Sequence, residues 1–183
     1  MHKDVKEILY DENQIAARVK EMGAHLTEKY RPAVERGERI VLLCVLRGAA
    51  IFMADLARAI DLPLEMDYMA VSSYGAAAKS SGVVSIKKDL SSDVAGKHLI
   101  IAEDVLDTGL TLQFLIENLQ ARNPASVAVV TFLRKDVPGQ ADIDCLDIGF
   151  TCPNEFIVGY GLDFAEHYRN LPYLGILKPE IYS

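Results

Sequence analysis

Residues 99–112 join an apolar run to three carboxylates and a threonine-glycine turn. Glu103 and Asp104 directly follow four apolar residues, and their side chains are hydrogen-bond acceptors that suit ribose hydroxyls or a hard cation. Residues 107–111 then offer backbone amides and two hydroxyls at the predicted start of a helix, where anions bind favourably. Carboxylates for a sugar and a metal, beside amides for a phosphate, predict a pocket for a sugar phosphate.

A second interpretation gives this segment a purely structural role. Asp107 would cap the helix, because aspartate is favoured at the position before the first helical turn. Capping explains Asp107 and Thr108, but it leaves the adjacent Glu103 and Asp104 unexplained. The sequence therefore favours the binding interpretation.

The hydrophobic pattern predicts the elements that position these residues. Residues 39–46 are rich in leucine and β-branched side chains, which is typical of a strand buried on both faces of a parallel sheet. Residues 12–30 have apolar side chains at helical spacing. Additional strands are predicted over 64–72, 97–102, 127–133 and 156–159, and additional helices over 49–60 and 110–121. This alternation predicts an α/β fold with a mainly parallel central sheet flanked by helices, in a single domain over residues 1–183.

The candidate site residues follow the predicted strands. They are Arg47, Gly48, Glu103, Asp104, Lys135 and Asp163. In parallel α/β sheets ligands bind beyond the carboxyl ends of the strands, so these residues are expected around one site. The sequence contains no complete glycine motif for a dinucleotide or a nucleoside triphosphate, which argues against those ligands.

The composition limits the class of protein. Hydrophobic residues make up 50% and charged residues 25%, as in globular proteins. Acidic residues outnumber basic ones by 26 to 19, which works against non-specific binding to nucleic acid or an anionic membrane. The longest apolar stretch, residues 40–59, contains three charged side chains and is too polar to span a membrane. Three cysteines without metal-ligand spacing, and a start that lacks the order of a signal peptide, predict a cytoplasmic location.

The acidic pair and the Thr-Gly-Leu-Thr turn over residues 108–111 resemble the motif with which type I phosphoribosyltransferases hold phosphoribosyl pyrophosphate. The sequence Phe-Ile-Val-Gly-Tyr-Gly-Leu-Asp over residues 156–163, with Arg169 shortly after it, narrows the resemblance to the hypoxanthine-guanine phosphoribosyltransferases. The similarity extends in order and spacing over residues 5–181. It implies a purine salvage enzyme in which the terminal segments form a small hood.

The resemblance also implies a role for each matched residue. The ribose and its 5-phosphate would be bound by Glu103, Asp104, Asp107, Thr108, Gly109, Leu110 and Thr111. The purine would be bound by Lys135, Phe156, Ile157 and Asp163, and the pyrophosphate by Arg47, Gly48 and Arg169. Mg²⁺ is the implied cofactor, with Glu103, Asp104 and Asp163 as candidate ligands. Asp107 would transfer the proton at the purine N7, and Ser73 and Tyr74 would begin a loop that closes over the reacting centre.

Two residues refine this assignment. Arg47 stands where the family usually has lysine, and arginine binds phosphate in a forked geometry. Lys135 has a donor-only ammonium, which suits the 6-oxo group of hypoxanthine or guanine and conflicts with the amino group of adenine. The residues around the purine C2 do not distinguish the oxopurines, so hypoxanthine is favoured while guanine and xanthine stay open.

A regulator that senses phosphoribosyl pyrophosphate while binding nucleic acid is the alternative from a different class. Such a protein is expected to carry a basic patch or an added DNA-binding module, and the sequence indicates neither. The expected partners are therefore phosphoribosyl pyrophosphate and a 6-oxopurine base, with no nucleic acid and no membrane. The resemblance also implies a homodimer or homotetramer, with the apolar residues 46–59 as a candidate shared face.

Overall fold

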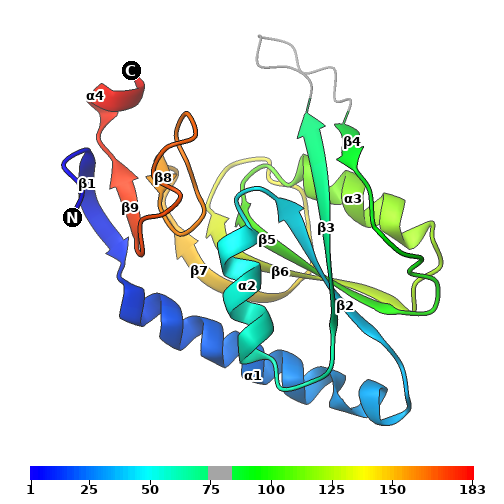
Figure 1. Ribbon diagram of the computed structural model, residues 1–183. Coiled ribbons are helices and arrows are strands. Elements are labelled where there is room, and N and C mark those ends of the chain that lie inside the picture. Colours follow the sequence, from blue (N-terminus) through cyan, green and yellow to red (C-terminus); the bar gives the residue numbers. More distant parts are fainter. Residues whose placement is uncertain (74–83) are drawn as a thin grey trace.

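Six strands form the main sheet of the computed structural model, in the order β4-β3-β2-β5-β6-β7 (Figure 1). Their bounds are β2 Ile40–Leu46, β3 Glu65–Ser73, β4 Val84–Lys88, β5 His98–Leu106, β6 Ser126–Lys135 and β7 Cys145–Cys152. β4 is antiparallel to β3, and the other neighbouring pairs are parallel. The structure describes residues 1–73 and 84–183, so Tyr74 of the predicted closing loop lies outside the described residues. The predicted mainly parallel α/β fold is confirmed.

Helices cover both faces of this sheet. They are α1 Glu12–Glu35, α2 Ala50–Ala59 and α3 Leu110–Gln120. Leu42 and Cys44 of β2 belong to the core that contains the buried residues of α1 and α2. Val41, Leu43 and Val45 belong to a second core, with the buried residues of α3. Because alternate side chains of a strand point to opposite faces, an uninterrupted apolar run fits between two helical layers.

A second sheet has three strands in the order β1-β9-β8, with antiparallel pairing. Its strands are β1 Val5–Tyr10, β8 Ile157–Val158 and β9 Leu174–Leu177, and the short helix α4 Pro179–Tyr182 follows β9. The first and last strands of the chain therefore lie side by side (Figure 1), and they form the predicted hood. Within the described residues, no helix is both long and apolar enough to cross a membrane.

Several strands differ from the sequence prediction. The strand predicted over residues 156–159 is β8, which belongs to the small sheet and not to the main one. The main sheet ends instead with β7, whose apolar pattern is interrupted by Asp147 and Gly149. Asp147 accepts a hydrogen bond from Arg18 of α1 at 2.6 Å, and a Cβ added to Gly149 would lie 2.5 Å from the Phe132 carbonyl oxygen. β1, β4 and β9 were not predicted either, because strands of four to six residues give a weak periodic signal.

β5 is longer than the sequence predicted, and this changes the position of the acidic pair. The prediction ended the strand at residue 102, before the two charges, whereas the observed strand continues to Leu106. Glu103 and Asp104 therefore lie within the strand, and Glu103 pairs with Thr131 of β6. Their position in the sheet gives both carboxylates a fixed backbone.

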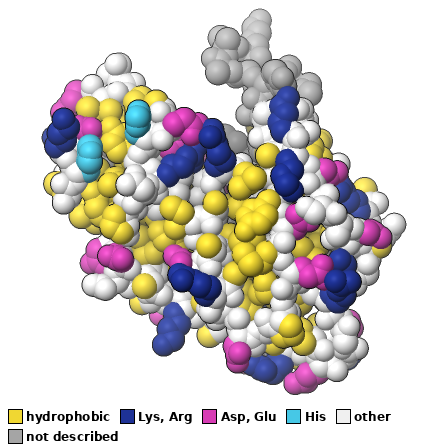
Figure 2. Space-filling view, viewed as in Figure 1, with side chains coloured by type: hydrophobic (Ala, Val, Ile, Leu, Met, Phe, Trp, Pro, Cys, Tyr) yellow, Lys and Arg dark blue, Asp and Glu magenta, His cyan; other side chains and the backbone are white. Residues whose placement is uncertain are grey.

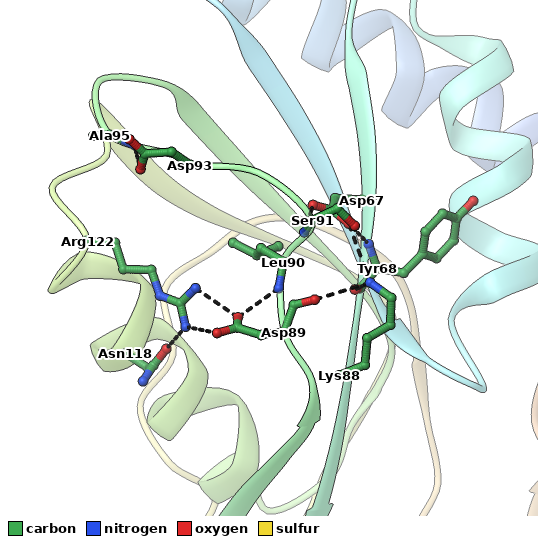
Figure 3. A network of polar contacts seen from close by, with 10 residues as sticks. All are labelled: Asp67, Tyr68, Lys88, Asp89, Leu90, Ser91, Asp93, Ala95, Asn118 and Arg122. Carbon is green, nitrogen blue, oxygen red and sulfur yellow. Dashed lines mark hydrogen bonds and ion pairs between the residues drawn. The ribbon is translucent and has the colours of Figure 1, made fainter.

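A polar network fastens β3 to the segment that precedes β5 (Figure 3). The Asp67 residue is 7% exposed, and its carboxylate accepts hydrogen bonds from the Tyr68 N–H at 2.8 Å. It also accepts from the Ser91 N–H at 2.7 Å and from the Ser91 hydroxyl at 3.0 Å. Nearby, Asp89 accepts two hydrogen bonds from Arg122, just after α3, at 2.8 and 3.0 Å. The network thus links β3, the segment that precedes β5, and the residues just after α3.

Replacing Asp67 by asparagine is expected to lower the free energy of unfolding by about 2 kcal/mol near pH 7, because hydrogen bonds to a charged group are lost. Burial raises the pKa of Asp67, but hydrogen bonds from Ser91 and Tyr68 and the Lys88 charge outweigh burial and lower it overall. A carboxyl with a lowered folded-state pKa stabilises the protein above its unfolded-state pKa, and this contribution is lost as the pH falls through the folded-state value.

Urea unfolding of the wild type and Asp67→Asn between about pH 7 and pH 3 measures this effect, and the difference should shrink as the pH falls. Asp61→Asn serves as a control, because the Asp61 side chain is 96% exposed. We expect the control to change the free energy of unfolding by less than about 0.5 kcal/mol. Equal stabilities of Asp67→Asn and the wild type at neutral pH would contradict the role given to the network.

Candidate active site

The carboxyl ends of β2, β5 and β6 lie next to one another, because these strands are parallel neighbours. Arg47 and Gly48 follow β2, and residues 107–111 follow β5. Lys135 is the last residue of β6 and not, as the sequence suggested, a residue beyond the strand. The structure therefore brings these three segments to the same edge of the sheet, as the strand pattern predicted.

Glu103 and Asp104 form a partly buried acidic pair near the end of β5. The Oε2 atom of Glu103 is buried and has no hydrogen-bond partner among the described residues. Burial raises the pKa of Glu103, and the charge of Asp104 raises it further. Burial also raises the pKa of Asp104, against the opposing effects of the Val105 N–H and the Arg169 guanidinium. A cation or hydroxyl donors would stabilise the charged form of such a pair.

Gly48 allows the backbone after β2 to pass close to this acidic pair. A Cβ added to Gly48 would lie 1.6 Å from Oδ2 of Asp104, so a larger residue would displace the carboxylate. Among residues 1–73 and 84–183, no group of three or more His, Cys, Asp or Glu side chains is placed to hold a metal ion. Mg²⁺ needs only one or two protein carboxylates when substrate and water oxygens complete its shell. The acidic pair, with its unpartnered Oε2 atom, fits such a site.

The loop after β5 enters α3 through Gly109, which occupies the N-cap position with φ +78°. The capping interpretation of Asp107 is therefore wrong, and no side chain of residues 1–73 or 84–183 caps this helix. Gln113 N–H donates to the Gly109 carbonyl oxygen at 2.9 Å, so the helical N–H groups before Gln113 have no acceptor within the helix. A cavity of about 130 Å³ lies between the end of β5 and the start of α3. Free backbone donors around such a cavity suit a phosphate.

Lys135 and Asp107 face each other across the loops that follow β5 and β6. Their Nζ and Oδ2 atoms are 3.5 Å apart, and the Lys135 side chain is only 17% exposed. Gln140 donates to the carbonyl oxygens of Asp107 at 2.6 Å and Lys135 at 3.0 Å, which ties the two loops together. A cavity of about 900 Å³ adjoins Lys135 and is lined also by Gln140 and Cys152. The sequence gave no signal that Gln140 belongs to this region.

The loop after β8 brings Asp163 and Arg169 toward the acidic pair from the small sheet. Gly161 has φ +102°, and a Cβ added there would lie 2.0 Å from the Gly48 carbonyl oxygen. Nη2 of Arg169 lies 2.8 Å from Oδ1 of Asp163, and Nη1 donates to the Gly161 carbonyl oxygen at 2.8 Å. Both charges interact electrostatically with Asp104. Asp163 thus belongs to a loop of the hood, whereas the predicted strand order placed it after a strand of the main sheet.

Ile157 is the first residue of β8, and Phe156 directly precedes it. The Phe156 ring contacts Phe164 edge-to-face, with 5.3 Å between centroids, and stacks on Tyr182 at 5.1 Å. Ile157 is 6% exposed and pairs with Ile176 of β9. The ring of Phe156 is half-buried, whereas the side chain of Ile157 is part of the core.

Glu166 joins the two candidate pyrophosphate ligands, although the sequence analysis assigned it no role. Arg47 forms an ion pair with one oxygen of Glu166, and Arg169 Nη2 lies 3.4 Å from the other. The peptide bond between Leu46 and Arg47 is cis. The sequence signal that could have identified Glu166 is its spacing, since it follows Asp163 by three residues and precedes Arg169 by three.

Comparisons with known proteins agree with this geometry. A model of the phosphoribosyl transferase domain matches residues 6–165. The hypoxanthine-guanine phosphoribosyltransferase of Mycobacterium avium is 49% identical over 98% of this chain and 89% of that protein. The protein of the same name from Bacillus subtilis is 47% identical over 100% of this chain and 99% of its own. A crystal structure of a hypoxanthine phosphoribosyltransferase from Staphylococcus aureus has a TM-score of 0.92 and 47% identity, covering 100% of this chain and 97% of that chain.

The main sheet thus carries an acidic pair near the end of β5, beside a loop that enters α3 through Gly109. The chain belongs to the phosphoribosyltransferase family, because the family model and the relatives both cover most of it. Its similarity is to members that are named for hypoxanthine and guanine.

Gly161→Ala tests the close contact between the loops after β8 and β2. The added methyl group would meet the Gly48 carbonyl oxygen, and alanine is strained at φ +102°. We expect the free energy of unfolding to fall by about 3 kcal/mol, as the sum of backbone strain and overpacking. Gly37→Ala is the matched control, since Gly37 has φ +83° but, apart from its chain neighbours, no residue that the structure describes lies within 4 Å of the added Cβ. Its loss should be about 1–2 kcal/mol.

Urea unfolding of both variants gives the comparison directly. A larger loss of unfolding free energy for Gly161→Ala than for Gly37→Ala supports the contact between the two loops. Equal losses would show that this contact does not affect stability.

Proposed function

We propose that this protein transfers the 5-phosphoribosyl group from phosphoribosyl pyrophosphate to N9 of a 6-oxopurine, with release of pyrophosphate. The acidic pair beside the loop into α3 carries this proposal, because acceptors for ribose hydroxyls lie next to backbone donors for a phosphate. The names of the relatives from Mycobacterium avium, Bacillus subtilis and Staphylococcus aureus support the same reaction. Hypoxanthine would give IMP and guanine would give GMP.

The sugar phosphate would be held by the segment that ends β5 and begins α3. Glu103 and Asp104 would accept hydrogen bonds from the ribose hydroxyls, directly or through Mg²⁺. The N–H groups and hydroxyls of residues 107–111 would bind the 5-phosphate. As the bond from C1 to the pyrophosphate oxygen breaks and the bond from C1 to N9 forms, positive charge develops on the ribose beside the two carboxylates. Mg²⁺, when bound, would neutralise charge on the departing pyrophosphate.

The purine would lie between the loops after β5 and β6 and the start of β8. Lys135 would donate to the 6-oxo group, Phe156 would stack on the ring, and the Ile157 backbone and Asp163 would meet its far edge. Asp107 would exchange the proton at N7, and its distance of 3.5 Å from Lys135 is consistent with both groups meeting one purine. Asp163 would in addition be a ligand of Mg²⁺.

The pyrophosphate would be bound by Arg47, the backbone at Gly48, and Arg169. These residues come from the loops after β2 and β8, which approach each other at Gly161. Ser73, the last residue of β3, and Tyr74 keep their predicted role in closing over the reacting centre and excluding water.

We also propose that the protein acts as a single domain in a homodimer or homotetramer. Two observations support a shared face near residues 46–59: Ile51 on α2 is 37% exposed, and Met66 on β3 is 44% exposed. Figure 2 shows hydrophobic side chains gathered on the face that carries these two elements. The free cysteines Cys44, Cys145 and Cys152 are consistent with a reducing cytoplasm.

The base specificity is tested with phosphoribosyl pyrophosphate, Mg²⁺ and four bases in separate reactions. Hypoxanthine is expected to give nucleotide and pyrophosphate in equal amounts, and adenine is expected to be inert because its amino group would face the Lys135 ammonium. Reactions with guanine and xanthine then show whether the site accepts a hydrogen-bond donor or an acceptor at the purine C2. If no base reacts while phosphoribosyl pyrophosphate still binds, the regulator interpretation replaces the enzyme.

Asp107→Asn tests the proton transfer. Asparagine keeps the size of the side chain but cannot exchange the proton, so kcat should fall by about 10²- to 10⁴-fold. The KM for phosphoribosyl pyrophosphate should change little, because the backbone donors of the loop are retained. Asp142→Asn is the control. Asp142 is exposed and has no role in the proposed reaction, so kcat and KM of this variant should match those of the wild type. Comparable losses in kcat and in substrate affinity would assign Asp107 a structural role instead.

A further inference from the structure

The Glu166 carboxylate lies between two guanidinium groups that come from different parts of the chain. One of its oxygens pairs with Arg47 after β2, and the other is 3.4 Å from Nη2 of Arg169. Figure 2 shows acidic and basic side chains together over the loop that follows β8. A pyrophosphate group also presents negatively charged oxygens to two cations at once, so Glu166 resembles the ligand proposed for the same two arginines.

The backbone holds Glu166 in this position at a conformational cost. Phe164 and His167 flank a two-residue hairpin turn. The Phe164 N–H donates to the His167 carbonyl oxygen at 3.2 Å, and the His167 N–H donates to the Phe164 carbonyl oxygen at 2.9 Å. The central residues of this turn, Ala165 and Glu166, have φ of +49° and +68°. Such turns favour Asn and Gly at these positions, and left-handed backbone is unfavourable for other residues. The Glu166 N–H also donates to Asp163 Oδ2 at 2.9 Å, which fixes the turn against the site.

Arg169 supplies a second, independent observation. Its Nε atom is buried and has no hydrogen-bond partner among the described residues. A buried donor without an acceptor is unfavourable, and an anionic ligand is the kind of partner that satisfies it. The Arg169 guanidinium is thus only partly satisfied by Asp163, Glu166 and the Gly161 carbonyl.

An exposed ion pair alone explains this arrangement poorly. The side chains of Arg47 and Glu166 are 66% and 56% exposed, and pairs of this kind contribute little to stability. Such a pair gives no reason for a strained turn that places one carboxylate against both arginines. Unfavourable backbone geometry that is retained at a binding site is more often connected with function.

We propose that Glu166 is an internal competitor for the pyrophosphate group. Its carboxylate holds Arg47 and Arg169 when the site is empty, and it must leave both before the pyrophosphate moiety can engage them. This inference rests on the proposed function, in which these two arginines bind pyrophosphate. Glu166 is a positioning residue that acts through the arginines and sets the affinity for substrate and product at this end of the site.

The consequence is a selective change in affinity when the competitor is removed. In Glu166→Gln the carboxylate becomes a neutral amide of the same shape, and the two arginines are released. We expect pyrophosphate to bind about three- to tenfold more tightly in the presence of Mg²⁺, the range set by one or two exposed ion pairs. The KM for phosphoribosyl pyrophosphate should fall by a similar factor, whereas the KM for hypoxanthine should not change.

Calorimetric titration with inorganic pyrophosphate and Mg²⁺ measures the first effect on the full chain, and steady-state kinetics measures the second. Glu180→Gln is the matched control, because it removes one exposed negative charge that has no ion-pair partner among the described residues. Its pyrophosphate affinity should stay within about twofold of the wild type. Equal gains in Glu166→Gln and Glu180→Gln would overturn the proposal, since net charge alone would then explain them.

A double-mutant cycle with Arg47→Met tests whether Glu166 acts through the arginine. In that background the gain from Glu166→Gln should be smaller, at about threefold or less, because only the contact with Arg169 is still competed for. An undiminished gain would contradict the mechanism. Unfolding midpoints of the variants identify any that fail to fold. If the wild type forms nucleotide but Glu166→Gln binds pyrophosphate no more tightly, this inference fails alone; if the wild type forms no nucleotide, the proposed function fails first.

Discussion

The central strands of this protein are buried on both faces, and this burial determines where polar side chains can lie. β2 has six consecutive buried residues, which alternate between the core under α1 and α2 and the core under α3. Unpaired polar side chains are unfavourable between two apolar layers, so they gather where the strands emerge. Arg47, the acidic pair and Lys135 all occupy that edge. Burial of the central strands therefore leaves these charged residues where the strands emerge from the two apolar layers.

The negative charges of the acidic pair are the main electrostatic feature of this edge that needs compensation. Two adjacent carboxylates repel each other, and burial raises the pKa of both. The protein supplies partial compensation through the charge of Arg169 and through the Val105 N–H, which donates to Asp104 Oδ1 at 2.8 Å. Within the described part of the chain, Glu103 Oε2 has no hydrogen-bond partner. A bound group that carries positive charge or hydroxyl donors would stabilise the charged form of the pair. This is the physical reason for proposing a sugar with a divalent cation here in preference to a second anion.

Local patterns in the sequence were sufficient for the core of the fold, and long-range packing was not visible in them. The apolar run of β2 and the helical spacing of α1 gave those elements, because each signal depends on neighbouring residues. β7 was missed because Asp147 serves a partner on α1 and Gly149 accommodates the Phe132 backbone. The acidic pair and the loop before α3 were predicted as a binding site from residue types, and the structure places them next to each other. Gln140 and Glu166 could not be assigned, since their positions depend on contacts between separate loops.

The site is divided between two sheets, and its completeness depends on the pairing of the chain ends. β1 and β9 pair through Val5 and Leu177, and β9 in turn holds β8, from which the loop with Asp163 and Arg169 continues. Val5, Val158 and Leu177 form a separate small core of this sheet, whereas Ile157 and Leu174 belong to the core that α1 and α2 cover. The proposed ligands of pyrophosphate come from both sheets, because Arg47 and Gly48 follow β2 whereas Arg169 lies beyond β8. Packing of the hood against the main sheet is therefore what brings the two arginines to one site.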